Sequence, residues 1–488
     1  MGDIAFVRGL RPHAQARSSV EIQRSRSQHR RVSVKGNGRG RVREKKRMEA
    51  EQDVERPSLG DWWLVGVLCL VNAVAFIDRA ALPLLVQPIK RDLQISDTLM
   101  SFLIGAAFII TYSVGGWFVG VLVDRFRRRR ILAMGVAVWG LSTMFCGSVS
   151  TYAGLFLGRC GVGAGEATCG PSSMSLVTDA FHPRFRGRAV AIWAMGASIG
   201  GGLALLGGGA ILHFVGESGS YILPLLGIAV RSWQLVLIAC GAIALPVALL
   251  VYSFREPTRR SATTDSPFAL RDALEVVRDR WLLFAPLFLA NAATIMLSVG
   301  YSSWIPAFLG RVWKIPAGEI GLTYGLIVLF LSTASQFIAG FLVDTVYRRW
   351  GLSAIPALGV VVSGLIFLPA VFVPAAGSIV SVWMLLAVFN LLAASLFTIG
   401  TSTIVHLSPG PAIGKITAVH FAWVGITGTA IAPTLVAIVA ESFFQGALGS
   451  ALSTVGGTLA ALGGLSLLVV YWQLRPNETV ASLARETG

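Results

Sequence analysis

The sequence predicts an all-α integral membrane protein with twelve transmembrane helices in two pseudo-symmetric six-helix bundles. Three observations support this fold class: a composition poor in charge, twelve apolar segments of membrane-spanning length, and one motif that occurs in both halves. Of the 488 residues, 54% are apolar and 14% are charged, whereas a soluble domain has about 25% charged residues. Together with a mean hydropathy of +0.69, this composition argues against a water-soluble globular protein.

Twelve segments meet the length requirement for a membrane-spanning helix, which is about 20 mainly apolar residues. They lie at residues 62–84, 99–122, 131–149, 153–178, 189–213, 232–253, 281–305, 318–343, 352–373, 376–405, 414–440 and 448–472. The break at residues 374–377 separates the ninth segment from the tenth.

The loops predict the orientation of the chain, because cytoplasmic loops carry an excess of Lys and Arg. With the N-terminus inside, the cytoplasmic loops hold 17 of these residues and the opposite loops hold five. The five are Lys90, Arg91, Arg231, Arg311 and Lys314. We therefore expect a multi-pass protein of the cell membrane (plasma membrane or bacterial inner membrane) with both termini in the cytoplasm.

The formal net charge of +16 raises the question of a nucleic-acid partner. Residues 1–56 hold 15 Lys and Arg and 7 Asp and Glu, so half of the net charge lies in this segment. It has no apolar periodicity and no apolar core of a signal peptide, which predicts a disordered basic tail. Met48 is an alternative start, and attraction of the tail to a lipid surface is an alternative role. Neither reading requires a nucleic acid.

The longest polar connection, at residues 255–280, divides the spans six and six. The predicted organisation is a basic disordered cytoplasmic tail (1–56), an N-terminal six-helix bundle (57–254), a cytoplasmic central loop (255–280), a C-terminal six-helix bundle (281–473) and a cytoplasmic C-terminal tail (474–488). The five cysteines all lie in apolar segments and form no CxxC pair. They predict neither a disulfide framework nor a zinc site, and we expect no cofactor and no metal.

One motif follows the second span of each half. Gly120, Leu122, Asp124, Arg128 and Arg129 recur at identical spacing as Gly340, Leu342, Asp344, Arg348 and Arg349. Five matches at the same topological place indicate two homologous bundles. Duplicated halves around a central site are typical of secondary transporters.

Two segments identify a family. Residues 120–129, in which Asp124 and Arg125 precede a basic cluster, resemble the loop signature of the major facilitator superfamily, with Arg127 in place of its usual second glycine. Residues 163–167, Gly-Ala-Gly-Glu-Ala, resemble the helix-four motif of that superfamily in the form typical of its spinster-like branch. Residues 76–79 and 179–188 are similar to the same branch.

The resemblance covers about residues 60–475. It implies the major facilitator fold and a carrier that alternates between inward-open and outward-open forms, with the substrate between the two bundles. Spinster-like proteins of animals move lysophospholipids and sphingoid phosphates, and bacterial relatives are proton-linked exporters or uptake systems.

Four ionisable residues lie within the predicted spans, namely Asp78, Arg79, Arg159 and Glu166. Each costs at least ~2.5 kcal/mol on insertion scales, so each requires a reason. Asp78 and Arg159 are both expected in the outer half of the membrane, where they can face each other, and Glu166 lies two helical turns from Arg159 on the same face.

Burial favours a neutral carboxyl group and a nearby guanidinium favours a charged one, so protonation can switch such a pair. We therefore predict that Asp78 is the proton-coupling carboxylate and that Arg159 is its partner and an anchor for a substrate carboxylate or phosphate. Glu166 is the second candidate for binding protons or substrate, and Arg79 is a further candidate of the same group, with extension toward the membrane surface as its alternative. The alternative is that these residues only tie helices together.

The repeated motif predicts a cytoplasmic gate. Its residues are Gly120, Asp124, Arg125, Arg128, Arg129, Asp179, Gly340, Asp344, Arg348 and Arg349. Asp124 is expected to contact a facing helix N-terminus and Arg128, and Asp179 is expected to accept hydrogen bonds from the same arginine cluster. The alternative is that these charges only set the topology.

The C-terminal half has no equivalent interior charge. Its interior polar residues are Asn291, Gln336, Asn390 and His420, and we expect this half mainly to shape the substrate pocket. Tyr301, Trp304 and Pro306 could line that pocket, although packing is the favoured role.

The sequence thus predicts a secondary active transporter, not an enzyme, that is coupled to protons and moves a small amphiphilic or anionic organic solute. A lysolipid or a drug is a candidate for export, and the alternative is a proton-coupled uptake symporter for an organic anion. An ATP-driven pump is disfavoured because residues 410–416 have the wrong glycine spacing for a phosphate-binding loop. The expected partners are a small-molecule substrate, protons and the lipid bilayer, with no nucleic acid and a monomeric chain.

Overall fold

The computed structural model describes residues 57–216, 219–222, 227, 229–259, 270–408 and 413–486. The described helices belong to one compact unit, Ser58–Gly488. The predicted basic tail at residues 1–56 lies outside the described residues, as do residues 260–269 of the predicted central loop.

The N-terminal half is helical apart from one short hairpin. Its helices are α3 (Leu59–Leu84), α4 (Val86–Leu93), α5 (Asp97–Ser101), η1 (Phe102–Ala106, π-helical), α6 (Ala107–Arg125), α7 (Arg128–Ser148), α8 (Tyr152–Glu166), α9 (Cys169–Ala180), α10 (Pro183–Val215), α11 (Ser232–Leu250) and η2 (Val251–Ser253, 3-10). Strands β1 (Ser220–Ile222) and β2 (Ala229–Arg231) pair antiparallel. Ser58 begins α3 with a capping box: the Ser58 hydroxyl accepts from the Asp61 N–H at 3.2 Å, and the Asp61 carboxylate accepts from the Ser58 N–H at 2.8 Å.

The C-terminal half has the same helical character. Its elements are α12 (Leu270–Asp279), α13 (Trp281–Val312), α14 (Ala317–Ile327), η3 (Val328–Ser332, π-helical), α15 (Thr333–Trp350), α16 (Ala354–Phe372), α17 (Ile379–Leu407), α18 (Ile413–Gly425), η5 (Ile426–Ile431, π-helical), α19 (Ala432–Phe443) and α20 (Leu448–Glu486). The segment predicted as a C-terminal tail from residue 474 therefore continues α20 as far as Glu486.

Eleven helices among the described residues are long and apolar enough to cross a membrane. The remaining predicted span, residues 153–178, is divided into α8 and α9 by a turn at Ala167 and Thr168. Neither piece alone reaches membrane-spanning length, but together they make the twelfth span and complete the predicted fold class.

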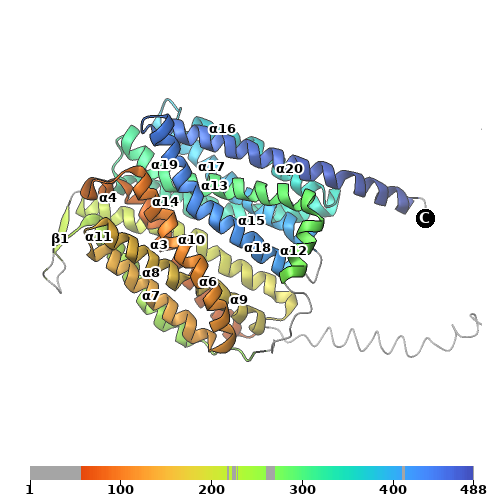
Figure 1. Ribbon diagram of the computed structural model, residues 1–488, viewed down its shortest axis with the longest axis horizontal. Helices are drawn as coiled ribbons and strands as arrows, with labels where there is room; N and C mark the ends of the chain where they lie inside the picture. Colours follow the sequence, from red (N-terminus) through yellow and green to blue (C-terminus); the bar gives the residue numbers. More distant parts are fainter. Residues whose placement is uncertain are drawn as a thin grey trace, which may run out of the picture. The chain divides into compact units, whose positions relative to one another are not determined.

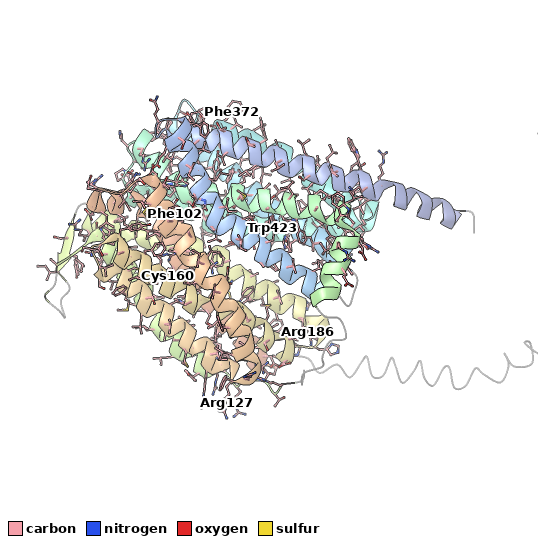
Figure 2. All side chains as sticks on the ribbon, viewed as in Figure 1. Phe102, Arg127, Cys160, Arg186, Phe372 and Trp423 are labelled. Carbon is pink, nitrogen blue, oxygen red and sulfur yellow. The ribbon has the colours of Figure 1, made fainter. Side chains whose placement is uncertain are left out.

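The spans run between two ends of this unit (Figure 1). We call one the Trp62 end, where the Trp62 ring contacts the Phe181 ring at 5.1 Å between centroids. The other is the Asp97 end, which holds α4 and the β1–β2 hairpin. Arg127 and Arg186 lie at the Trp62 end of the N-terminal half (Figure 2).

The two halves contact each other mainly from mid-span to the Asp97 end. α10 packs on α14 and η3, α5 and η1 pack on α19 and η5, and α3 packs on α13. Glycines permit this close approach: a Cβ at Gly209 would lie 2.8 Å from the Gly321 Cα, and a Cβ at Gly105 would lie 2.2 Å from the Thr429 carbonyl oxygen. Small residues are the usual means by which membrane helices approach closely.

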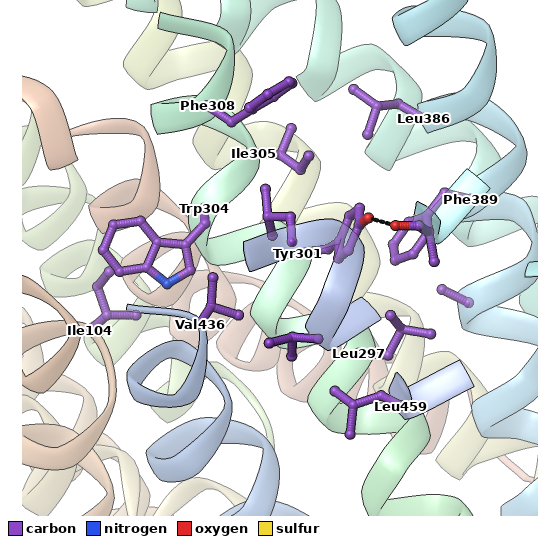
Figure 3. Packing of buried hydrophobic residues seen from close by; sticks show 14 of the residues in the cluster. Ile104, Leu297, Tyr301, Trp304, Ile305, Phe308, Leu386, Phe389, Val436 and Leu459 are labelled. Atoms are coloured by element: carbon purple, nitrogen blue, oxygen red, sulfur yellow. Dashed lines mark hydrogen bonds between the residues drawn. The ribbon is translucent and has the colours of Figure 1, made fainter. Parts of the chain in front are cut away.

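Buried aromatic residues form the core of the C-terminal half (Figure 3). The Tyr301 ring stacks on the Phe389 ring at 4.4 Å, and the Tyr301 hydroxyl donates a hydrogen bond to the Ala370 carbonyl. The Trp304 indole donates to the Pro433 carbonyl at 2.9 Å. Tyr301 and Trp304 therefore serve packing between helices, the role that the sequence favoured for them.

Candidate functional site

The four predicted interior charges lie on two helices of the N-terminal half. Asp78 and Arg79 belong to α3, and Arg159 and Glu166 belong to α8. Asp78, Arg159 and Glu166 are buried, whereas the Arg79 side chain keeps 28% of its surface exposed. We call these four residues the buried charge cluster.

Within the cluster, Arg79 and Glu166 form a direct ion pair. The Arg79 Nε and Nη2 atoms donate to the same Glu166 oxygen, Oε2, at 2.8 and 2.6 Å. Arg79 therefore does not follow the alternative course of extending toward the membrane surface. A fully buried carboxylate requires a cation, and this need outweighs the tendency of Arg to reach toward water.

Aromatic rings cover the Arg79 guanidinium. Its carbon atom lies 5.0 Å from the ring centroid of Phe76, 4.5 Å from that of Phe108 and 5.4 Å from that of Tyr112. Ring faces attract cations at these distances, so they hold the guanidinium in place without neutralising it. Nothing in the sequence singles out Phe108 and Tyr112, because they lie about 30 residues from Arg79 on another span.

Asp78 is bound by a hydroxyl group and not by an arginine. Its Oδ2 atom accepts a hydrogen bond from the Thr143 hydroxyl at 2.7 Å. No donor among the described residues lies within hydrogen-bonding distance of its Oδ1 atom, and the same is true of Oε1 of Glu166. The cluster thus contains two buried carboxyl groups, each with one oxygen free to receive a proton or a ligand.

Arg159 and Asp78 are near enough to interact electrostatically, but the predicted ion pair between them is not formed. The Arg159 Nε atom donates to the Leu103 carbonyl at 3.2 Å, and its guanidinium lies 5.5 Å from the Phe108 ring centroid. Leu103 belongs to η1, and π-helical turns of this kind displace carbonyl groups from the regular helical pattern. The Phe108 ring therefore contacts both guanidinium groups of the cluster.

The turn after Glu166 places this residue at the C-terminus of α8. Helix C-termini carry a partial negative charge, so an anionic side chain there needs a nearby cation, which Arg79 supplies. The Thr168 hydroxyl donates to the Gly165 carbonyl at 2.9 Å and so satisfies one carbonyl at this end.

Glycines of the helix-four motif bring α8 close to its neighbours. A Cβ at Gly163 would lie 2.2 Å from the Phe108 carbonyl oxygen, and a Cβ at Gly165 would lie 2.7 Å from the Trp139 nitrogen. Any larger side chain would push α8 away from α6 or α7. The motif therefore permits the close packing of α8 on α6 and α7.

At the Trp62 end, Arg128 is the centre of a second polar contact. Its guanidinium is buried and donates to the Asp179 carboxylate and to the Ser175 hydroxyl, the latter at 3.1 Å. Its backbone N–H donates to Glu256 at 2.9 Å, and Nη2 donates to the Pro257 carbonyl at 2.8 Å. The predicted contact between Asp179 and the arginine cluster is present, whereas the contribution of residues 256 and 257 was not expected.

The other predicted gate residues of the N-terminal half lie in or next to α6 and α7. Arg125 is exposed at the end of α6, and the Arg129 guanidinium donates to the Phe254 carbonyl at 2.8 Å. Gly120 and Asp124 lie in α6, and the Asp124 side chain is outside the described part of the structure.

The same motif makes different contacts in the C-terminal half. Asp344 and Arg348 approach to 4.0 Å but are exposed, with 66% and 80% of their side chains accessible. Arg349 lies over the Trp350 ring at 5.2 Å, and a Cβ placed at Gly340 would meet no other described element within 4 Å. The residues of the motif are therefore the same in both halves, but the contacts of Arg128 in the N-terminal half are not repeated by Arg348 in the C-terminal half.

The interior polar residues of the C-terminal half bond mostly to backbone. The amides of Asn291 and Asn390 donate to carbonyls one turn earlier, at 2.9 and 2.8 Å. Gln336 instead donates to Ser198 of the other half at 2.7 Å. His420 is buried with its ring 5.7 Å from that of Phe288. Across the described ranges, no group of three or more His, Cys, Asp and Glu side chains is arranged to hold a metal ion.

Comparison with known proteins gives a consistent result. A family model described as "Major Facilitator Superfamily" matches residues 68–433. An "MFS-type efflux pump" of Mycolicibacterium smegmatis is 31% identical over 296 residues, which cover 59% of this chain and 63% of that protein. "Protein spinster" of Drosophila melanogaster is 23% identical over 316 residues, which cover 62% of this chain and 49% of that protein. The matched segments thus span about half to three fifths of these relatives.

One solved structure shares the fold. It is a crystal structure of a bacterial homolog of the human lysosomal transporter spinster, in an inward-facing and unoccupied conformation. The superposition has a TM-score of 0.70, covers 85% of this chain and 96% of that chain, and pairs residues that are 22% identical. With 22% of the paired residues identical, this similarity shows a shared fold only.

Proposed function

The chain belongs to the Major Facilitator Superfamily, and from this premise we propose that it is a proton-coupled secondary transporter that moves a small amphiphilic or anionic organic solute by alternating access. Membership makes it a multi-pass membrane transporter of small molecules and not an enzyme, and the relatives bear out its spinster-like character. The observation that carries the finer proposal is the buried charge cluster, because interior charges without a transport role would cost stability.

In this proposal Asp78 binds the coupling proton. Its Oδ1 atom has no donor among the described residues, and Oδ2 is held by Thr143. A proton on Oδ1 neutralises Asp78 and leaves the nearby Arg159 with less opposing charge. Arg159 is then free to exchange the Leu103 carbonyl for an anionic group of the substrate, since carboxylates and phosphates bind guanidinium more strongly than a carbonyl does.

Glu166 and Arg79 supply a second switch. While Glu166 is ionised, it occupies the Nε and Nη2 atoms of Arg79. Protonation of Glu166 would remove that counter-charge, and the partly exposed guanidinium would become a site for an anion. Binding of protons and binding of an anionic solute thus favour each other, which is the linkage that proton symport requires.

The cations and the aromatic rings around them support the substrate class. Phe76, Phe108 and Tyr112 offer apolar ring surface beside Arg79, so the site suits a solute with an anionic group next to an apolar body. The efflux-pump relative favours export. The alternative is uptake of an organic anion with protons, and the mutually favourable binding of protons and an anion at the same two guanidinium groups supports it.

The contacts between the halves support a conformation closed at the Asp97 end. By the distribution of basic loop residues, we propose that the Trp62 end faces the cytoplasm, that both termini are cytoplasmic, and that this conformation is inward-open. The contacts of Arg128 with Asp179 and Glu256 would then order the cytoplasmic ends of α7, α9 and α11 as parts of the gate.

The experiment is a substrate screen in proteoliposomes with and without an imposed pH gradient. Candidate solutes are lysophospholipids, apolar drugs and small organic anions. Wild type is compared with Asp78→Asn, Arg159→Ala and the matched control Asp279→Asn, which removes an exposed carboxylate outside the cluster.

We expect Asp78→Asn to abolish the stimulation by the pH gradient and Arg159→Ala to lower affinity for anionic solutes, while Asp279→Asn behaves as wild type. Gradient-driven uptake or efflux that persists unchanged in Asp78→Asn would refute the coupling role of this residue.

A further inference from the structure

A second group of charges lies at the Asp97 end, where the two halves meet. Asp97 is the first residue of α5, which continues without interruption through η1 into α6, and it is 3% exposed. Arg311, near the end of α13, donates to both oxygens of Asp97: Nη1 to Oδ2 at 2.7 Å and Nη2 to Oδ1 at 2.6 Å. This two-bond geometry is the strongest form of an arginine–carboxylate contact. It joins the N-terminal half to the C-terminal half.

The backbone of the same segment is bound by a second residue of the C-terminal half. Glu441, near the end of α19, accepts from the N–H groups of Asp97 and Thr98 at 2.8 and 3.2 Å, and its other oxygen accepts from the Thr98 hydroxyl at 2.5 Å. These N–H groups open a helix and have no partner within it. Glu441 therefore caps a helix of the opposite half.

Lys90 completes the group from within the N-terminal half. Its Nζ atom lies 2.5 Å from Asp97 Oδ1. Because Lys90 and Asp97 belong to the same half, this pair can persist when the halves separate, whereas the contacts of Arg311 and Glu441 cannot. The Asp97 carboxylate would then keep one counter-charge throughout a transport cycle, which lowers the cost of breaking the others.

We propose that Asp97, Arg311 and Glu441 are gating residues that close the Asp97 end and that must separate each time this end opens. These three residues lie nearer the Asp97 end than the contact between η1 and η5. One helical turn deeper than Asp97, the Ser101 and Thr434 hydroxyls lie 3.2 Å apart across the same interface. Opening the path therefore requires α5 to leave α19. Lys90 and Arg311 thus have a role beyond the orientation expected of them as basic loop residues. The inference rests on alternating access alone and not on the proton or the substrate.

The test measures access to a cysteine placed behind the gate. In Ser101→Cys, a membrane-impermeant maleimide reaches residue 101, which is fully buried in this conformation, only when the Asp97 end opens. Reaction of the five native cysteines is subtracted with a parallel sample that retains Ser101. Arg311→Gln and Glu441→Gln are each added to Ser101→Cys, and Arg311→Lys serves as the conservative variant.

Arg231→Gln is the matched control. Arg231 pairs with Asp92 at 2.6 Å at the same end, but both residues belong to the N-terminal half. We expect Arg311→Gln and Glu441→Gln to raise the labelling rate at least tenfold, which corresponds to about 1.4 kcal/mol. Arg311→Lys should fall between these variants and wild type, and Arg231→Gln should label as wild type.

An unchanged labelling rate in both gate variants, or an equal rise in Arg231→Gln, would overturn the proposal. A second measurement covers variants that fail to fold: the pair Ser101→Cys with Thr434→Cys is oxidised to a disulfide across the interface. Labelling of a cysteine at Ala430, one helical turn deeper than Thr434, by the same maleimide applied from the Asp97 side should then stop and return with a reductant, and labelling that continues in the oxidised protein would contradict the gate. Neither readout needs a substrate or a pH gradient, so failure of the coupling proposal would leave both results interpretable.

Discussion

Removal of Arg79 should expose the energetic demand of the buried carboxylate beside it. Glu166 is fully buried, and its Oε2 atom receives two charge-assisted hydrogen bonds from Arg79 at 2.8 and 2.6 Å. Breaking a buried ion pair by removing one partner costs about 3–5 kcal/mol. Because the Arg79 side chain is 28% exposed, we expect Arg79→Ala to lower the free energy of unfolding by about 3 kcal/mol, at the lower limit of that range.

The assay is reversible unfolding of the purified protein in mixed micelles, performed as a double-mutant cycle with Glu166→Gln. When both charges are removed, no buried carboxylate is left unpaired, so the double variant should be more stable than the two single effects predict by about 1–3 kcal/mol. The loss in Arg79→Ala should also shrink as the pH is lowered, because a protonated Glu166 needs no counter-ion.

Arg348→Ala provides the reference, since its ion pair with Asp344 is exposed and should contribute about 0–1 kcal/mol. If Arg79→Ala destabilises the protein no more than Arg348→Ala does, or if the two effects in the cycle add without coupling, the ion pair does not stabilise the cluster and the reasoning is wrong.

Three further substitutions test a close helix contact, a buried ion pair and a buried hydrogen bond. Gly163→Val should abolish stable expression or cost more than ~3 kcal/mol, because its Cβ alone would lie 2.2 Å from a carbonyl oxygen of α6; Gly364→Val, at a glycine with open space around it, should be tolerated, and equal unfolding curves for the two would contradict this. Arg128→Ala should cost about 3–5 kcal/mol, since it leaves buried carboxylate and backbone groups without their donor, and the same unfolding assay with Arg348→Ala as control tests it. Tyr301→Phe should cost about 1 kcal/mol through loss of one buried hydrogen bond, whereas a neutral effect would mean that ring packing alone stabilises this core.

Much of the fold could be predicted from the sequence because membrane-spanning length and loop charge are local properties. The divided fourth span could not. Residues 153–178 form one apolar segment in the sequence, and the turn at Ala167 and Thr168 becomes evident only from the way α8 and α9 pack on α7. Length and hydropathy do not record where a helix is interrupted by its neighbours.

The sequence singles out the four residues of the buried charge cluster but not the pairings between them. Composition identified Asp78, Arg79, Arg159 and Glu166, since charges within apolar spans stand out. Pairing depends on which way each side chain turns around its helix axis, and Arg79 and Asp78, although adjacent in sequence, point about 100° apart. Arg79 therefore reaches Glu166 while Asp78 faces Thr143 on α7.

The two copies of the repeated motif have the same residues at the same spacing, but their arginines lie in different environments. Arg128 is buried because Glu256 and Pro257, which follow the last span of the N-terminal half, cover it. Arg348 occupies the same place in the motif of the C-terminal half, but its side chain is exposed. Identical spacing predicts a common origin of the two halves, but the segment that follows each half decides whether the arginine is bound.

The π-helical segment η1 fixes the rotational phase between two parts of the second span. It lies between Asp97, which meets the C-terminal half, and Phe108, whose ring contacts both guanidinium groups of the charge cluster. Because one residue corresponds to about 100° of rotation around a helix, deletion of a single residue from Phe102–Ala106 would turn one of these faces away from its partners while both flanking helices remained intact. In an alignment of related chains, a one-residue gap should therefore be allowed within Phe102–Ala106. A chain that is one residue shorter or longer in this segment would direct the equivalent side chains of the second span differently.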